Sequence, residues 1–172
     1  MSINRSLVLT ILGKDRPGMV KNISRIIADL NGNWLDSHLA EIAGYFGGLI
    51  HVTVAAEKAE NLAEALKKVE GIDVLLKPGE EEPKHPDSPE LRLELVGNDR
   101  PGIVRHVTEA IASHGANLLE LKTEYSSAPM SGQEIFKAEA RIQLPPESSL
   151  TALQSDLETI ASDLMVDIRV EP

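Results

Sequence analysis

The sequence predicts an α+β protein: two ferredoxin-like βαββαβ domains in one chain, each with an antiparallel sheet and helices on one face. The stretch GKDRPGMV at residues 13–20 returns as GNDRPGIV at residues 97–104, an offset of 97 − 13 = 84 positions without a gap. In both copies, apolar residues alternate before this motif and follow helical spacing after it. A repeat of this length indicates two copies of one domain rather than a solenoid of small units.

The first domain, residues 1–77, begins with a strand. Leu7, Leu9 and Ile11 occupy alternate positions, as expected for a strand with one buried face. We expect Pro17 in the first turn of the following helix, where its missing N–H costs nothing. The apolar face of this helix is predicted to contain Val20, Ile23, Ile27 and Leu30.

Periodicity and turn residues place the remaining elements of the first domain. The hairpin strands cover 34–42 and 49–55, turn residues occupy 44–48, the second helix covers 57–70 and the last strand 72–76. The complete order is βαββαβ, the split pattern of ferredoxin-like folds.

Residues 78–89 are rich in proline and acidic side chains, which predicts an extended linker. The second domain, residues 90–172, repeats the element order, with Pro101 expected in the first turn of its first helix. The apolar face of that helix is predicted to contain Val104, Val107, Ile111 and His114, and one face of the next strand Leu119, Leu121, Thr123 and Tyr125. The hairpin loop at 126–133 is longer than in the first domain, and longer loops carry function more often.

Composition excludes several functional classes. The 172 residues include 17 basic and 27 acidic ones, for a net charge of −10, which argues against a large phosphate-binding surface and direct nucleic-acid binding. The absence of cysteine excludes disulfides, a catalytic thiol and a thiolate metal site. No secretory leader and no membrane-spanning apolar run is evident, so we expect a cytoplasmic protein that does not contact membranes.

The repeated motif predicts a ligand site at the start of each helix. The first backbone amides of a helix have no intrahelical partner and lie at the positive end of its dipole, so they can hold a carboxylate or phosphate. An aspartate just before them can accept bonds from an ammonium group. The residues concerned are Asp15, Gly18, Met19 and Val20, and in the second copy Asp99, Gly102, Ile103 and Val104. This arrangement suits an amino-acid zwitterion; the alternative is that glycine and proline only shape the turn, with the aspartate capping loop amides.

An enzyme and a nucleic-acid-binding protein are the competing classes. The five histidines lack His-Glu-x-x-His spacing, and the nucleophile-elbow and P-loop motifs are missing, so we predict no catalytic residue and no cofactor. His38 and His51 are candidate cross-strand neighbours that suggest a weak metal pair, but histidines on sheet surfaces are more often structural, and no metal site is predicted. Ferredoxin-like sheets that bind RNA use surface aromatics, which make up only 3% of this chain.

With Asp-Arg-Pro-Gly after the first strand of both copies and a doubled βαββαβ order, the chain resembles tandem ACT-domain proteins over nearly its whole length. With two such modules, little else, and the Ala-Pro-Met-Ser-Gly loop at 128–132, it resembles the glycine cleavage system transcriptional repressor family. The resemblance implies a regulator that binds an activator protein, with repression relieved by glycine or a similar amino acid. A regulatory subunit of an amino-acid biosynthetic enzyme is the alternative, and a homodimer is left open.

The resemblance also implies which residues contact the ligand. Carried over position by position, they are Asp15, Gly18, Met19 and Val20, and Asn98, Asp99, Gly102, Ile103 and Val104. We associate an asparagine in this loop with ligand contact in the family. The first copy has Lys14 where the second has Asn98, so the second copy matches the pattern more closely.

Overall fold

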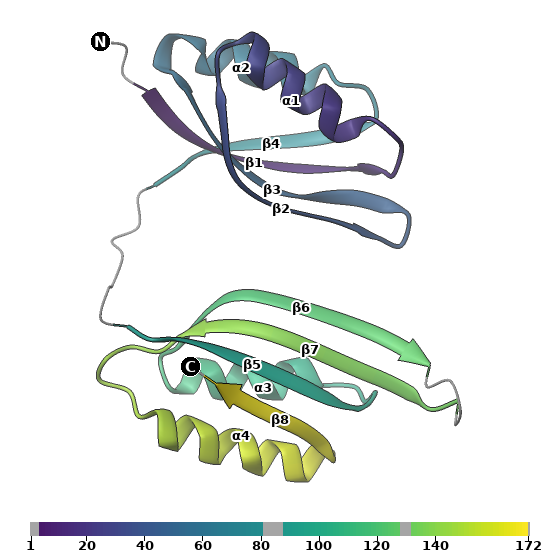
Figure 1. The fold of residues 1–172 in the computed structure, drawn as a ribbon, viewed down its shortest axis with the longest axis vertical. Helices are drawn as coiled ribbons and strands as arrows, with labels where there is room; N and C mark the ends of the chain where they lie inside the picture. The colour runs from purple at the N-terminus through teal and green to yellow at the C-terminus, as the bar shows by residue number, and fades with distance from the viewer. Residues whose placement is uncertain (1–3, 81–87, 128–131, 172) are drawn as a thin grey trace. The chain divides into compact units, whose positions relative to one another are not determined.

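The computed structural model describes residues 4–80, 88–127 and 132–171. They form two compact units, 1–83 and 84–172, each with its own hydrophobic core (Figure 1). Both units have the βαββαβ order, which confirms the predicted fold. Within these ranges, no helix is long and apolar enough to cross a membrane.

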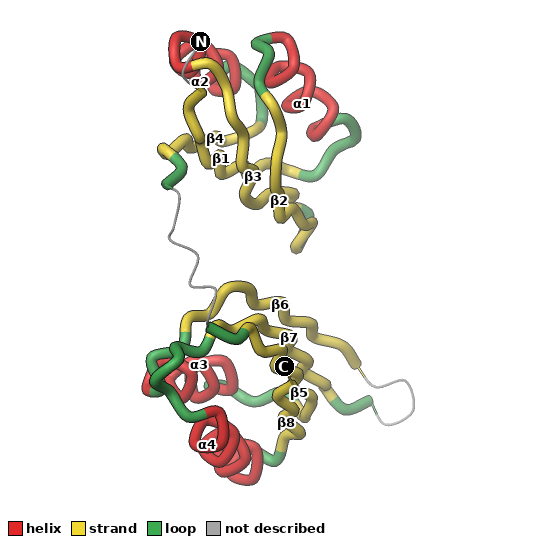
Figure 2. Tube along the Cα trace, turned by 60° about the vertical axis from the view of Figure 1, so that its left-hand side comes forward, coloured by secondary structure: helices red, strands yellow, loops and turns green. Residues whose placement is uncertain are grey.

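The first unit is an antiparallel sheet in the order β2-β3-β1-β4, with the helices on one face (Figure 2). Its elements are β1 (Asn4–Lys14), α1 (Met19–Asp29), β2 (Asn33–Ile42), β3 (Tyr45–Ala55), the 3-10 helix η1 (Ala56–Lys58), α2 (Ala59–Lys67) and β4 (Ile72–Pro78). The predicted linker therefore begins inside β4, and its residues 81–87 lie outside the described part of the chain.

The second unit has the corresponding sheet order, β6-β7-β5-β8, also antiparallel. Its elements are β5 (Glu90–Asn98), α3 (Ile103–Ser113), β6 (Asn117–Ser127), β7 (Glu134–Gln143), α4 (Leu150–Leu164) and β8 (Val166–Glu171). Of the long hairpin loop, residues 128–131 are outside the described residues, and the same holds for most of the loop motif on which the resemblance partly rests.

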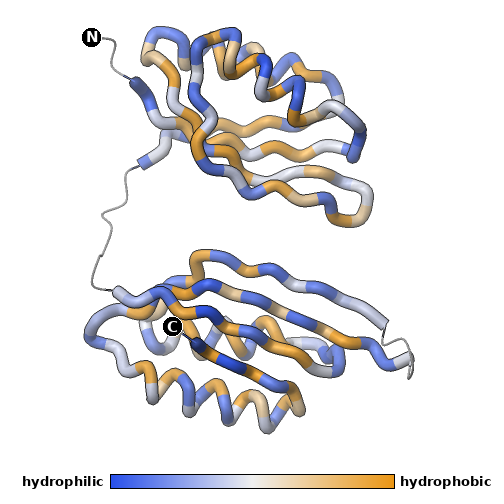
Figure 3. The backbone as a smooth tube through the Cα atoms, viewed as in Figure 1, coloured by the Kyte–Doolittle hydropathy of each residue, from blue (hydrophilic) through white to orange (hydrophobic). Residues whose placement is uncertain are grey.

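Each core lies between the helices and one face of the sheet. Alternate residues of the first strand are buried, Leu7, Leu9 and Ile11 in β1, as predicted. Apolar residues recur along the strands and at intervals along the helices in Figure 3, as expected for elements with one buried face.

The buried face of the motif helix differs by one position from the prediction. Met19, Ile23 and Ile27 are buried in α1, at spacings of four residues. Val20 comes one position later and is 40% exposed, and its counterpart Val104 in α3 is also 40% exposed. The prediction that these two valines belong to the buried faces is therefore wrong.

The hairpin of the first unit is tighter than predicted. Only Ala43 and Gly44 form its turn, and both have positive φ, 52° and 82°. Two consecutive positive φ values match the two-residue hairpin turn whose twist fits that of the flanking strands. The residues predicted as further turn, 45–48, are instead part of β3.

The second strand of each unit contains a bulge that the alternation pattern did not predict. Pairing shifts register between Trp34 and Ser37 in β2 and between Leu118 and Glu120 in β6. An extra residue in one strand moves the side chains beyond it to the other face. Leu118 and Leu121 consequently line the same apolar cavity, whereas Leu119, predicted to share a face with Leu121, is not part of its lining.

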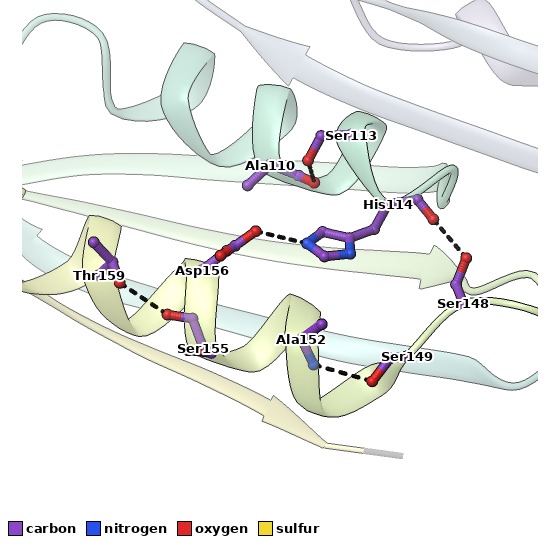
Figure 4. Close-up of polar contacts among 9 residues, drawn as sticks. All are labelled: Ala110, Ser113, His114, Ser148, Ser149, Ala152, Ser155, Asp156 and Thr159. Atoms are coloured by element: carbon purple, nitrogen blue, oxygen red, sulfur yellow. Dashed lines mark hydrogen bonds and ion pairs between the residues drawn. The ribbon is translucent and has the colours of Figure 1, made fainter.

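Polar contacts join the end of α3 to α4 (Figure 4). His114, predicted on the apolar face of α3, is the C-cap residue, and its Nε2 lies 2.8 Å from Asp156 Oδ2 on α4. Ser148 Oγ donates a hydrogen bond of 2.7 Å to the carbonyl of His114. Ser149 then caps α4 by accepting a bond from the Ala152 amide at 3.2 Å. These contacts hold the two helices in place over the sheet.

Candidate functional site

The repeated motif forms a turn between the first strand and the first helix of each unit. The N-cap residues Gly18 and Gly102 have φ 92° and 95°, values that favour glycine. The helices begin one residue later, so the prediction that Pro17 and Pro101 lie in the first helical turn is wrong. Each proline instead precedes a positive-φ glycine, the sequence that a type II turn requires.

The first glycine of the motif is required because neighbouring atoms leave no room for a side chain. A Cβ at Gly13 would collide with the carbonyl oxygen of Gly71, just before β4. A Cβ at Gly97 would collide with the side chain of Val166, the first residue of β8. In both units the strand must therefore lack a side chain at this position for the last strand to pair with it.

The arginine of the motif links this turn to the loop before the last strand. Arg16 donates a hydrogen bond to the carbonyl of Glu70, next to Gly71 with φ 72°. Arg100 makes the corresponding but weaker contact, 4.0 Å from the sulfur of Met165, which has φ 55°. Arg16 and Arg100 therefore have a structural role.

The backbone of each motif aspartate is bonded to the hairpin of the same unit. The amide of Asp15 donates to the carbonyl of Gly44, and that of Asp99 to the carbonyl of Glu134, both at 2.9 Å. Both aspartates are exposed. The hairpin thus holds the backbone of the aspartate while its carboxylate stays in solvent.

The helix starts themselves have no side-chain cap. Neither Gly18 nor Gly102 makes a side-chain cap bond, and no acidic residue lies in the first turn of α1 or α3. The amides of the first turn have no partner within the helix and carry the positive end of its dipole. An anion near these amides would be stabilised, and the exposed aspartate lies a few residues away in the same turn.

The structure divides the predicted ligand residues into two groups. Met19 and Ile103 are 3% and 2% exposed, so their side chains belong to the core and only their amides face the helix start. The others are exposed or partly exposed: Asp15, Gly18, Val20, Asn98, Asp99, Gly102 and Val104. Lys14 and Asn98, the position at which the copies differ, are the last residues of β1 and β5.

The second helix start has neighbours that the sequence did not predict. The Tyr125 hydroxyl donates a hydrogen bond to the Glu134 carboxylate, which raises the pKa of Tyr125, and the charge of Asp99 adds to this effect. His106 Nδ1 lies 2.8 Å from the carbonyl of Gly102. Tyr125 and Glu134 flank the hairpin loop. Strand alternation in the sequence does not give the pairing register that brings these two residues together.

Polar contacts of His51 lie on the sheet face away from the helices. His51 Nε2 is 2.8 Å from Ser6 Oγ, and its Nδ1 is 3.5 Å from Asp36 Oδ2. The Asp36 side chain is 88% exposed, so this group lies open to solvent. His38 pairs with Leu49 rather than with His51. Across the three described ranges, no group of three or more His, Cys, Asp or Glu could hold a metal ion.

Comparisons with known proteins agree on one fold. The ACT domain family matches residues 5–74 and 91–171. The glycine cleavage system transcriptional repressor of Escherichia coli (strain K12) is 24% identical over 175 residues, 99% of this chain and 90% of that protein. A crystal structure of an unknown protein from Galdieria sulphuraria has a TM-score of 0.87 at 29% identity, covering 98% of both chains. A crystal structure of a candidate glycine cleavage system transcriptional repressor has a TM-score of 0.69 at 18% identity, covering 99% of this chain and 98% of that one. At this identity the similarity supports the fold alone.

Proposed function

This chain belongs to the ACT domain family, and we propose that it is an amino-acid-sensing repressor of the glycine cleavage system that acts through a protein partner. The similarity to the Escherichia coli repressor, which spans nearly the whole of both chains, supports this role. The observation that carries the sensing function is the duplicated helix start: uncapped amides beside an exposed aspartate whose backbone is fixed.

The proposed ligand is a small amino acid, glycine or one of similar size. Its carboxylate accepts hydrogen bonds from the amides of Met19 and Val20, or of Ile103 and Val104 in the second unit. Its ammonium group donates to Asp15 or Asp99. Charge-assisted hydrogen bonds of this kind are roughly twice as strong as neutral ones, and both ends of a zwitterion are matched.

Regulation follows if the amino acid binds one state of the protein better than another. The ligand then shifts the population toward that state, and the affinity for the partner changes by the same coupling free energy. The turn that would bind the ligand is joined to the hairpin through the amides of Asp15 and Asp99. Ligand binding would therefore act first on the hairpin end of each sheet.

The partner is proposed to be a transcriptional activator protein rather than DNA. A net charge of −10 opposes binding to a phosphate backbone. A regulatory subunit of an amino-acid biosynthetic enzyme is the alternative partner arrangement. Affinity capture with the tagged chain from its native cells distinguishes the two: recovery of an activator supports the repressor role, and recovery of a biosynthetic enzyme contradicts it.

We propose no catalytic role for the chain. The Ser6–His51–Asp36 group has the residue types of a hydrolytic triad, but its aspartate side chain is 88% exposed. A nucleophilic site needs donors for the developing oxyanion and shelter from water. Hydrolysis of an activated ester that is lost on His51→Ala would contradict this proposal.

Calorimetry against glycine, serine and other amino acids tests the sensing site. We expect measurable heat with at least one of them, and Asp99→Asn should weaken binding at the second-unit site about tenfold or more, because a hydrogen bond to a charged group is worth roughly 1.5–3 kcal/mol. The matched control is Asp163→Asn, which removes an exposed aspartate on α4. Equal affinities for Asp99→Asn and the control, or no heat with any amino acid, would reject the site.

A further inference from the structure

The uncovered face of the first sheet carries several strongly exposed aliphatic side chains. Four large aliphatic side chains on it are strongly exposed: Leu12 at 49%, Ile42 at 74%, Leu49 at 52% and Leu75 at 56%. They come from all four strands, and Leu12, Leu49 and Leu75 lie on the adjacent strands β1, β3 and β4. Exposed aliphatic side chains gathered on one face make that face a candidate interaction site.

The same face of the second sheet has the opposite character. Strand by strand it presents Glu120, Lys122 and Glu124 on β6, Lys137, Glu139 and Arg141 on β7, Arg92 and Glu94 on β5, and Asp167 and Arg169 on β8. Arg141 lies 3.6 Å from Glu120 and 3.9 Å from Glu90, and Lys122 lies 2.8 Å from Glu124. The two sheets have the same topology, so the fold does not account for the exposed aliphatic side chains on the first of them.

Three neighbouring rows of this face, taken over β3, β1 and β4, have a middle row and one flanking row on each side. The middle row runs across the strands through His38, Leu49, Thr10 and Leu75. Leu49 pairs with His38 and Thr10, and Thr10 pairs with Leu75. The next outward-facing row on one side contains His51, Val8 and Lys77. The next on the other side contains Gly47, Leu12 and Asp73.

We propose that this face binds the same face of a second copy of the chain, about a two-fold axis along the middle row. Such an axis places the middle row opposite its own counterpart, and each flanking row opposite the other flanking row of the second copy. Leu49 and Leu75 then meet their own counterparts. Val8 packs on Leu12 of the second copy, and Lys77 faces Asp73 of the second copy, twice in the dimer.

Charge and size complementarity argue for a second copy as the occupant. Asp73 and Lys77 carry opposite charges on either side of Leu75 on β4, and among the described residues neither has an ion-pair partner. The axis that pairs them also brings the bulky His51 opposite Gly47, which has no side chain. A self-complementary patch is what an isologous dimer requires.

The molecular mass in solution tests the proposal. At micromolar concentration the full chain is expected to sediment at twice its monomer mass of 18.7 kDa. Leu49→Lys, at the centre of the face, should give the monomer mass, because it buries an unpaired charge against its own counterpart. Val96→Lys is the matched control, because Val96 is 41% exposed on the corresponding face of the second sheet; it should leave the dimer intact.

A charge exchange tests the register of the dimer. Asp73→Lys and Lys77→Asp should each raise the dissociation constant several-fold, since each places like charges opposite one another. The double variant should restore it to near the original value. Far-UV circular dichroism checks that every variant is folded, which is expected because all these positions are exposed. A monomeric parent chain, a dimer insensitive to Leu49→Lys, or a double variant no tighter than the single ones would overturn the proposal.

Discussion

Gly97 lies where β5 and the start of β8 approach too closely for a side chain. A methyl group there would overlap Val166, which is itself buried. We expect Gly97→Ala to lower the free energy of unfolding by about 1–3 kcal/mol, the usual cost of inserting atoms into a packed site. Urea denaturation measures this, with Val96→Ala on the exposed side of the same strand as control. A loss no larger than the control's would mean that the strands adjust without cost.

The pKa of Tyr125 depends on charged groups near the second helix start. Its pKa is raised by the hydrogen bond to Glu134, by partial desolvation and by the charges of Glu134 and Asp99. A raised pKa favours the protonated phenol in the folded state, so any stability it contributes is present below the unfolded pKa and is lost as pH rises through the folded one.

The test is an ultraviolet pH titration of Tyr45→Phe, which leaves Tyr125 as the only tyrosine. Adding Glu134→Gln should lower the pKa of Tyr125, because the acceptor charge is removed. Glu124→Gln, beside Tyr125 in sequence, should leave it nearly unchanged. If the pKa of Tyr125 is the same in both glutamine variants, Tyr125 does not donate a hydrogen bond to Glu134.

The repeated motif shows which local structural features can be predicted from the sequence. Asp-Arg-Pro-Gly correctly indicated a turn, because proline and glycine restrict the backbone in specific ways. It did not indicate that Pro17 lies outside the helix, since proline suits both positions. It also gave no sign that Arg16 bonds to the carbonyl of Glu70, which depends on a contact between residues 54 positions apart.

At the scale of elements, helix α3 lies over an apolar cavity of about 20 Å³ lined in part by Ala138 and Ala140 of β7. In β3 the position corresponding to Ala140 is Ile50, which is fully buried. The cavity is large enough for about one water molecule but apolar, so it contributes fewer packing contacts than a filled core.

We therefore expect Ala140→Val to raise the free energy of unfolding of the second unit by up to about 1 kcal/mol, the scale of one or two buried methyl groups. Ile50→Ala, the reverse change in the first unit, should cost about 2–5 kcal/mol. Denaturant unfolding measures both. A destabilised Ala140→Val would show that the lining cannot move enough to accept the added atoms.

Element order and type were predictable because the hydrophobic periods are long and repeated. The hairpin turn was misplaced because Gly47 and Gly48 resemble turn residues, whereas in the structure they lie in β3, where a Cβ on either would meet the backbone of a neighbouring strand. The bulges in β2 and β6 were missed because a single extra residue leaves no mark on composition. Side-chain faces beyond a bulge therefore need the pairing register.

At the scale of the whole molecule, the chain has two separate cores. One consists of residues from β1 to β4 and the other of residues from β5 to β8, and each has its own candidate ligand site. The single tryptophan, Trp34, packs against the core of the first unit. Its fluorescence therefore reports unfolding of the first unit alone, while circular dichroism reports both.

This difference allows the two sites to be tested separately in one chain. A ligand that binds only the folded state stabilises it by about 2.7 kcal/mol at one hundred times its dissociation constant. For a unit of this size, the shift in melting temperature should be roughly 10 °C or more. With saturating amino acid, Asp15→Asn should abolish the shift seen by Trp34 fluorescence, and Asp99→Asn should leave that shift in place while reducing the one seen by circular dichroism. If either substitution removes both shifts, the ligand depends on both aspartates at once, and two independent helix-start sites are excluded.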